Sequence, residues 1–178
     1  PDTSHLLTRR DALSIAHKLT KDFKARVGTT GKLSRELYEI AKEESGISKD
    51  FLMVGSMGHV ISFTQGLCHA GVNGNVVCFD GDGSIMMHTG SLANVSTLPK
   101  KTKLLHIGFN NRIHESVGKI PTMLKNENIS LSKIAESMGY TKVFKITKEE
   151  EAKKIVEEFK SVKNENGPTS YFIEWMIS

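Results

Sequence analysis

Short apolar segments typical of buried strands alternate with segments of helical periodicity along the whole chain. The strand-like segments lie at 24–27, 51–54, 75–79, 103–109, 141–146 and 169–177. Helical periodicity is found at 8–23, 34–44, 59–69, 87–97, 131–138 and 147–162. This alternation predicts an α/β fold, with a doubly wound, mainly parallel six-stranded sheet, right-handed crossovers and helices on both faces.

Size and composition fit one ordinary globular domain, which we expect to span residues 1–178. Hydrophobic residues make up 38% of the chain and charged residues 25%, which is usual for such domains. The net charge of +4 is modest. Nucleic-acid binding would need a concentrated stripe of basic residues, and the sequence has none, so we expect no nucleic-acid partner. No apolar run approaches the roughly 20 residues of a membrane span, and no signal peptide is apparent. We therefore expect a cytoplasmic protein with no membrane partner, in which Cys68 and Cys78 are buried reduced thiols.

Two polar turns follow neighbouring strands of the predicted sheet. The sequence Asp-Gly-Asp-Gly-Ser follows the strand at 75–79, and the pair Asn-Asn follows the strand at 103–109. Open α/β sheets bind ligands at the carboxyl ends of their strands. Mg²⁺ prefers oxygen ligands, so Asp82, Asn111 and a nearby backbone carbonyl could form part of its coordination shell.

Either turn alone would be weak support for a metal site. Asp-Gly is a common hairpin turn, and Asn-Asn is a common loop signal. A helical pattern follows Ser84, however, which argues against a hairpin. The two turns together therefore predict a site for a metal ion and a diphosphate.

Two further turns are expected at the same edge of the sheet. Gly-Ser-Met-Gly at 55–58 follows one strand, and Thr-Thr-Gly at 29–31 follows another. Glycines allow a backbone to approach a ligand closely, although a tight turn with Met57 packed into the core is the alternative. In a parallel sheet all four turns would converge on one crevice.

Along the chain, Gly-Ser-Met-Gly at 55–58, Gly-Asp-Gly-Ser at 81–84 and Asn-Asn at 110–111 follow in this order. This order resembles the diphosphate-binding domain of thiamine-diphosphate enzymes. Within that group, the segments 29–37, 51–59 and 114–118 are similar to phosphonopyruvate decarboxylase. The β-subunit of sulfopyruvate decarboxylase is the next most similar. Lys119 and Ile120 stand where the resemblance leads us to expect Gly-Gln, so the substrate contacts of that loop stay open.

The resemblance implies a role for each matching residue. Asp82, Asn111 and the Ile113 carbonyl would bind Mg²⁺. Met57 would be an apolar wedge that bends the cofactor, and His114 and Glu115 would transfer protons or orient the cofactor. The implied cofactor-binding residues are Thr30, Gly31, Gly55, Ser56, Met57, Gly81, Asp82, Gly83, Ser84, Asn111, Ile113 and Ser116.

Several other polar residues are ambiguous. Lys32, Arg112 and Lys119 could meet a substrate phosphonate, although each alone is typical of ordinary surface charge. His59 is a weaker candidate for the site than His114. His106 lies within a strand and is expected to be a hydrogen-bonded core residue.

The resemblance further implies the non-oxidative decarboxylation of a 2-oxo acid that depends on thiamine diphosphate and Mg²⁺. Phosphonopyruvate, giving phosphonoacetaldehyde and CO₂, is the first expectation, and sulfopyruvate is the alternative. A pyrimidine-binding domain or subunit would supply an activating Glu within an oligomer, so the chain alone is expected to be incomplete. The rival outside this class is a non-catalytic module that binds a nucleotide phosphate, although neither the Gly-x-Gly-x-x-Gly nor the P-loop pattern is present.

Overall fold

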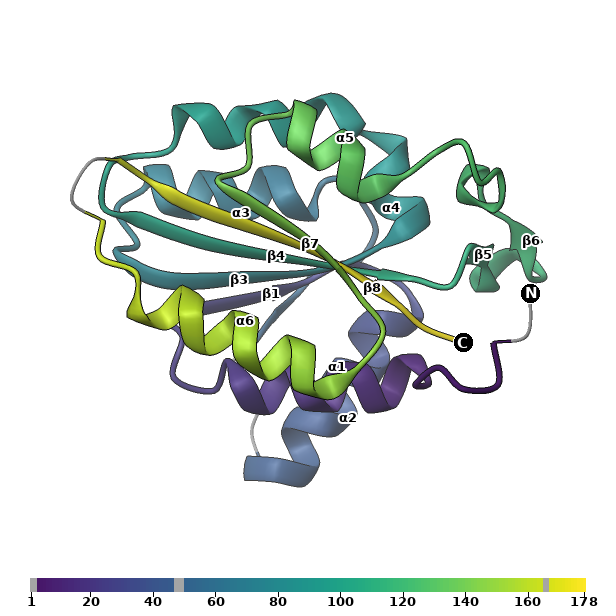
Figure 1. Cartoon of the computed structure of the whole chain (residues 1–178). Coiled ribbons are helices and arrows are strands. Elements are labelled where there is room, and N and C mark those ends of the chain that lie inside the picture. The colour runs from purple at the N-terminus through teal and green to yellow at the C-terminus, as the bar shows by residue number, and fades with distance from the viewer. Residues whose placement is uncertain (1–2, 47–49, 165–166) are drawn as a thin grey trace.

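A parallel sheet forms the centre of the computed structural model, which describes residues 3–46, 50–164 and 167–178 (Figure 1). Within these residues six strands pair in the order β2-β1-β3-β4-β8-β7, all of them parallel. The strands are β1 (Ala25–Gly28), β2 (Phe51–Leu52), β3 (Gly74–Gly81), β4 (Thr102–Asn110), β7 (Lys142–Ile146) and β8 (Thr169–Met176). The predicted doubly wound six-stranded fold is confirmed.

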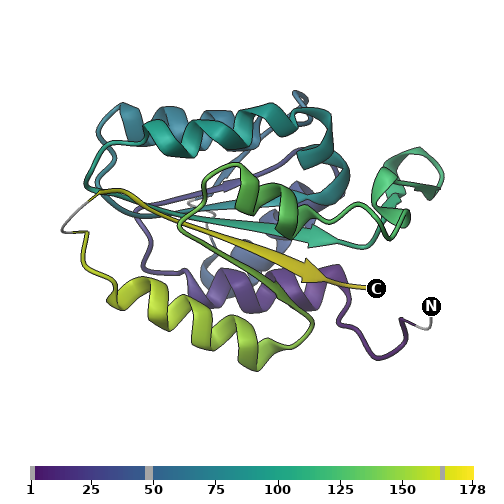
Figure 2. The ribbon, with the colours of Figure 1, turned by 45° about the horizontal axis from the view of Figure 1, so that its top comes forward.

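Helices cover both faces of the sheet (Figures 1 and 2). One face carries α1 (Arg9–Leu19), α2 (Lys32–Ser45) and α6 (Glu149–Ser161). The other carries α3 (Val60–His69), α4 (Asp82–Met87), the 3-10 helix η1 (Thr89–Thr97) and α5 (Leu131–Ser137). Each layer buries its own apolar cluster against the sheet, which positions the strand ends between two packed faces.

Local sequence accounts for several helix ends. The Thr8 side chain accepts a hydrogen bond from the Asp11 amide at the start of α1, and the left-handed Gly46 ends α2. The helix expected at 87–97 is different: α4 begins at once after β3, and a break at His88 separates it from η1. The Thr89 hydroxyl donates to the carbonyls of Ile85 and Met86, and such bonds compete with the helical backbone pattern.

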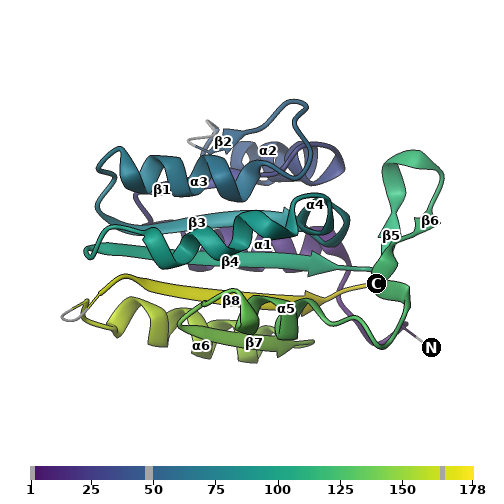
Figure 3. The same ribbon diagram turned by 90° about the horizontal axis from the view of Figure 1, so that it is seen from above.

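Between β4 and α5 the chain makes an excursion over residues 111–130, which we call the site loop. It contains a small antiparallel hairpin of β5 (Ile113–His114) and β6 (Ile120–Pro121), with the single 3-10 turns η2 (Glu115–Val117) and η3 (Met123–Lys125). Figure 3 shows this hairpin projecting beyond the carboxyl ends of the strands. The sequence predicted only an irregular stretch here.

Three smaller expectations concern burial. Cys68 and Cys78 are free and buried, as predicted, and burial raises the pKa of Cys68 to about 11. His106 is a hydrogen-bonded core residue, as expected, with its Nδ1 2.7 Å from the Tyr140 hydroxyl. In the part of the chain that the structure describes, none of the helices combines the length and apolar character needed to cross a membrane.

Candidate functional site

A pocket opens at the carboxyl edge of the sheet, where the turns after β1, β3 and β4 meet. Most residues that the sequence assigned to cofactor, metal or proton transfer line it. They are Thr30, Gly31, Met57, Gly81, Asp82, Gly83, Ser84, Asn111, Ile113, His114, Glu115 and Ser116. Gly55 and Ser56 are not among the lining residues, but the Gly55 amide donates to the Thr30 hydroxyl over 2.9 Å at its border.

Asp82 is a buried carboxylate at the start of α4, directly beyond β3. Burial raises its pKa to about 6, and hydrogen bonds from Thr122 and the backbone of Gly83 and Arg112 only partly oppose this effect. The Thr122 hydroxyl donates to Asp82 Oδ2 over 2.9 Å. Among the described residues Asp82 forms no ion pair. A cation beside this carboxylate would therefore replace the solvation that burial removes.

Ser84 joins three of the strand-end turns. Its Oγ lies 3.0 Å from the Thr29 hydroxyl and accepts a hydrogen bond from the Gly58 amide over 3.1 Å. The space around Gly58 is tight, because a Cβ there would lie 2.5 Å from His88 Nδ1, and its φ of +88° also favours glycine. The turn at 55–58 is thus fixed against the start of α4.

Asn111 lies just beyond the end of β4, in a turn that its own side chain closes. Its Oδ1 accepts from the Ile113 amide over 3.1 Å, and its Nδ2 donates to Glu115 Oε1 over 2.6 Å. Arg112, between them, has a left-handed φ of +62°. The turn brings Asn111 and Ile113 to the same pocket as Asp82.

Glu115 is held as a carboxylate by two cations. Arg9 Nη1 lies 2.7 Å from Glu115 Oε1, and Lys32 Nζ lies 3.2 Å from Oε2. Burial alone would raise the pKa of Glu115, but the hydrogen bonds and charges of Lys32 and Arg9 hold it below its usual value. Arg9 also makes a double contact with Glu36, with both distances 2.8 Å.

His114 and Met57 both line the pocket. A Cβ on Gly83 would lie 2.4 Å from His114 Cε1, so the imidazole can keep its present position only beside a glycine. Met57 is half-buried, lines the pocket and belongs to neither core cluster. The alternative that Met57 packs into the core is therefore wrong.

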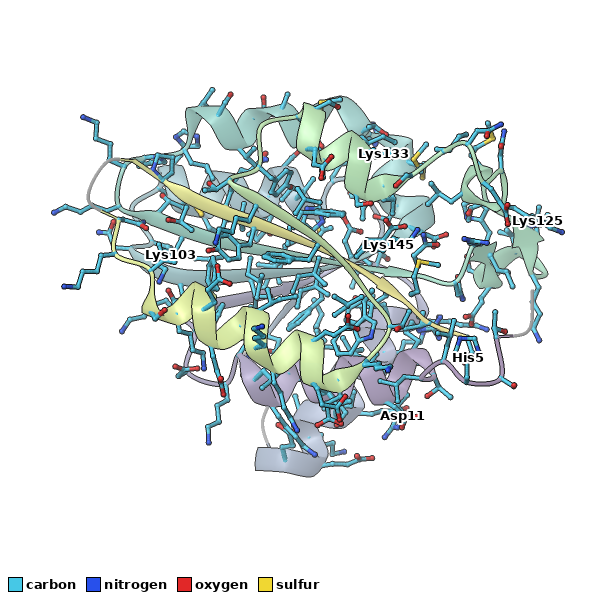
Figure 4. All side chains as sticks on the ribbon, in the orientation of Figure 1. His5, Asp11, Lys103, Lys125, Lys133 and Lys145 are labelled. Carbon is cyan, nitrogen blue, oxygen red and sulfur yellow. The ribbon has the colours of Figure 1, made fainter. Side chains whose placement is uncertain are left out.

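The other charged residues considered as site candidates do not all lie at this pocket. Lys32 lines the pocket, whereas Arg112 and Lys119 line a second cavity beyond the ends of β4, β7 and β8, which shares Asn111, Ile113 and Ile177 with the pocket. His5, Lys125 and Lys145, labelled in Figure 4, line that second cavity as well. His59 is exposed, and its ring packs against His88 in a tilted arrangement with centroids 4.1 Å apart.

Sequence reasoning missed two residues that shape the pocket, Arg9 and Thr122. Thr29 lines the pocket as the first residue of the predicted turn at 29–31. Arg9 and Thr122 carried no such signal, because each reaches its partner only through the tertiary fold. Arg9 contacts Glu115 across most of the chain, and Thr122 lies in the irregular stretch.

A comparison with protein families explains why these turns converge. Residues 26–173 match the family described as thiamine pyrophosphate enzyme, C-terminal TPP binding domain. This chain belongs to that family. The resemblance inferred from the four turns is thereby confirmed, and thiamine pyrophosphate, which is thiamine diphosphate, is the cofactor that the TPP-binding domain is named for.

Curated relatives of this TPP-binding domain include two kinds of decarboxylase. Phosphonopyruvate decarboxylase of Streptomyces viridochromogenes is 36% identical over 121 residues, which is 68% of this chain and 28% of that protein. The β-subunit of sulfopyruvate decarboxylase of Methanocaldococcus jannaschii is 34% identical over 139 residues, which is 78% of this chain and 68% of that subunit. The chain therefore spans less than a third of the first relative and about two thirds of the second.

Solved structures agree on the fold of the TPP-binding domain. Benzoylformate decarboxylase from Polynucleobacter necessarius superposes with a TM-score of 0.71 at 16% sequence identity. The match covers 94% of this chain and 33% of that protein.

Proposed function

We propose that this domain binds thiamine diphosphate through Mg²⁺ as one part of an enzyme that decarboxylates a 2-oxo acid without oxidation. The observation that carries the proposal is a pocket, in a member of the TPP-binding family, lined jointly by Asp82, Asn111 and Ile113. A carboxylate, an amide oxygen and a backbone carbonyl are the hard oxygen ligands that Mg²⁺ prefers.

The chemistry of Asp82 supports a metal at this place. Its carboxylate is buried, its pKa is raised to about 6, and its hydrogen-bond donors are neutral groups. A divalent cation would compensate the buried negative charge. Asp82, Asn111 and the Ile113 carbonyl would hold the ion, which would link the domain to the diphosphate.

The rest of the pocket lining supports the proposal that thiamine diphosphate binds there. Thr30, Gly31 and Gly83 offer backbone groups and little side-chain bulk at the lining. Met57 would give the apolar contact that holds the cofactor bent. When bound, thiamine diphosphate supplies the electron sink for decarboxylation.

Two pocket residues, His114 and Glu115, are proposed to transfer protons or to orient the cofactor. Glu115 is ionised by Arg9 and Lys32, which favours an orienting role over proton donation. His114 lines the pocket with its ring against Gly83, and imidazole is the side chain best suited to proton transfer near neutral pH.

We propose phosphonopyruvate as the substrate, with sulfopyruvate as the second candidate. The names of the relatives support both, and Lys32 is a cation at the pocket that could meet the anionic group of either acid. Steady-state turnover of the two 2-oxo acids by the assembled enzyme distinguishes them. The proposal is contradicted if neither acid is consumed.

A partner domain or subunit is part of the proposal. The phosphonopyruvate decarboxylase relative is much longer than this chain, and the sulfopyruvate decarboxylase relative is named as a subunit. We propose that a pyrimidine-binding domain, with its activating Glu, completes the site in an oligomer in the cytoplasm.

Calorimetry with the full-length protein tests the cofactor site. Thiamine diphosphate should bind in the presence of Mg²⁺, and Asp82→Ala should abolish that binding. Unchanged affinity in Asp82→Ala would end the proposal. Thermal-shift measurements with thiamine diphosphate plus Mg²⁺, ATP and NAD separately test the rival, a nucleotide-phosphate module, which predicts stabilisation by ATP or NAD instead.

A further inference from the structure

Glu174 is a charged residue near the carboxyl end of the buried strand β8. Its exposed fraction is 1%, and its chain neighbours Ile173 and Trp175 are fully buried. Burying a carboxylate is unfavourable unless hydrogen bonds or charges compensate it. The fold alone would be served by an apolar residue at this position.

The two oxygens of Glu174 bind the two ends of the site loop. Oε1 accepts a hydrogen bond from Asn110 Nδ2 over 2.7 Å, and Oε2 accepts one from the Ser132 amide over 3.0 Å. Asn110 is the last residue of β4, where the loop leaves the sheet, and Ser132 lies in the first turn of α5, where the loop ends. Lys145, labelled in Figure 4, places its Nζ 3.9 Å from Oε1.

Asn110 transmits this contact to the candidate metal ligands. Its Nδ2 is bound to Glu174, which turns its Oδ1 toward the Arg112 amide, the donor of a 3.0 Å hydrogen bond. Arg112 is the left-handed residue of the turn between Asn111 and Ile113. The carboxylate therefore fixes a side chain that in turn fixes the backbone carrying both ligands.

We propose that Glu174 is a positioning residue that clamps both ends of the site loop and so orients Asn111 and Ile113 toward the metal. The part that concerns the metal rests on the proposed function. The clamp itself does not, because it predicts the mobility of the loop in the protein without cofactor.

The test uses the opposite polarities of carboxylate and amide. In Glu174→Gln, one side-chain oxygen becomes an NH₂ group that faces a donor, either Asn110 Nδ2 or the Ser132 amide, so one hydrogen bond is lost. Adding Asn110→Asp reverses the pair: the introduced glutamine donates its NH₂ group to the introduced aspartate, which still accepts from the Arg112 amide. The oxygen of the glutamine still accepts from the Ser132 amide. The double variant therefore restores all three hydrogen bonds and the single negative charge.

Hydrogen–deuterium exchange of the full-length protein without cofactor is the first measurement. Glu174→Gln should speed exchange of amides in 111–130 by about tenfold, the effect of losing one charge-assisted hydrogen bond. The double variant should return exchange to near the wild-type rate. Asp50→Asn is the matched control, because Asp50 is a buried carboxylate that pairs with His17 and Arg26 away from the pocket.

Calorimetric affinity for Mg²⁺ and thiamine diphosphate is the second measurement. Glu174→Gln should weaken binding about tenfold, with recovery in the double variant. Unchanged exchange in 111–130, an increase in 111–130 no larger than that in Asp50→Asn, or no recovery in the double variant would each overturn the clamp. If the wild-type protein itself fails to bind the cofactor, the proposed function fails, while the exchange data still decide the clamp.

Discussion

Asp82 is the residue in which stability and the proposed function oppose each other. A carboxyl group whose pKa is higher in the folded state than in the unfolded state stabilises the fold only while it is protonated. For Asp82 the pKa rises from 3.8 to about 6. The stabilising contribution is therefore complete below about pH 4 and is lost as the pH rises through 6.

Asp82→Asn removes this titration and should stabilise the protein without cofactor at high pH. The gain in the free energy of unfolding should be up to about 3 kcal/mol larger at pH 8 than at pH 4, since each pKa unit corresponds to about 1.4 kcal/mol. Urea denaturation at the two pH values measures it. Mg²⁺ with thiamine diphosphate should stabilise only the wild-type protein, and a gain independent of pH would contradict the assigned burial.

Met57→Ala separates a pocket residue from a core residue. Because Met57 is half-buried and outside both core clusters, the free energy of unfolding should fall by less than about 1 kcal/mol. The matched control, Leu92→Ala, removes a fully buried side chain and should cost about 2–5 kcal/mol. Cofactor affinity should fall in Met57→Ala only, and a loss of stability as large as that of Leu92→Ala would show that Met57 is a core residue.

At the scale of elements, the close approach of α4 and the site loop depends on one glycine. Gly83→Ala places a methyl group where the His114 ring lies. Since His114 is only half-buried and lies in the short hairpin of the site loop, the ring should shift at a cost of about 1 kcal/mol or less. Cofactor affinity should nevertheless fall, and the NMR signals of the His114 ring should move.

Gly66→Ala is the control for this glycine. Gly66 lies inside α3, and an added Cβ meets no atom within 4 Å. The substitution should stabilise the helix by about 0.5–1 kcal/mol and leave cofactor binding unchanged. Equal binding losses in the two variants would contradict the specific contact between Gly83 and His114.

The elements also show what local sequence can predict. The period of apolar residues placed six strands and their helices, and the turn residues placed Asp82 and Asn111 at one edge, because both signals are local. The break at His88 depends on a side chain that competes for helix carbonyls. The contacts of Arg9, Thr122 and Glu174 depend on how distant elements pack, which no local pattern encodes.

For the whole molecule, the proposal predicts an activity that needs two parts. This TPP-binding domain, supplied alone, should not release CO₂ from either 2-oxo acid. Activity should appear when a pyrimidine-binding domain with its Glu is present, on the same polypeptide or as a separate subunit. A coupled assay of CO₂ release before and after mixing measures this, and full activity of the isolated domain would contradict the division of the site.

The position of the metal tests the central claim most directly. Crystals of the full-length protein with thiamine diphosphate and Mn²⁺, in place of Mg²⁺, give an anomalous diffraction signal that locates the ion. We predict one peak bound by the Asp82 carboxylate, Asn111 Oδ1 and the Ile113 carbonyl, at about 2.1–2.2 Å from each. A cofactor bound with its metal peak elsewhere would contradict the account.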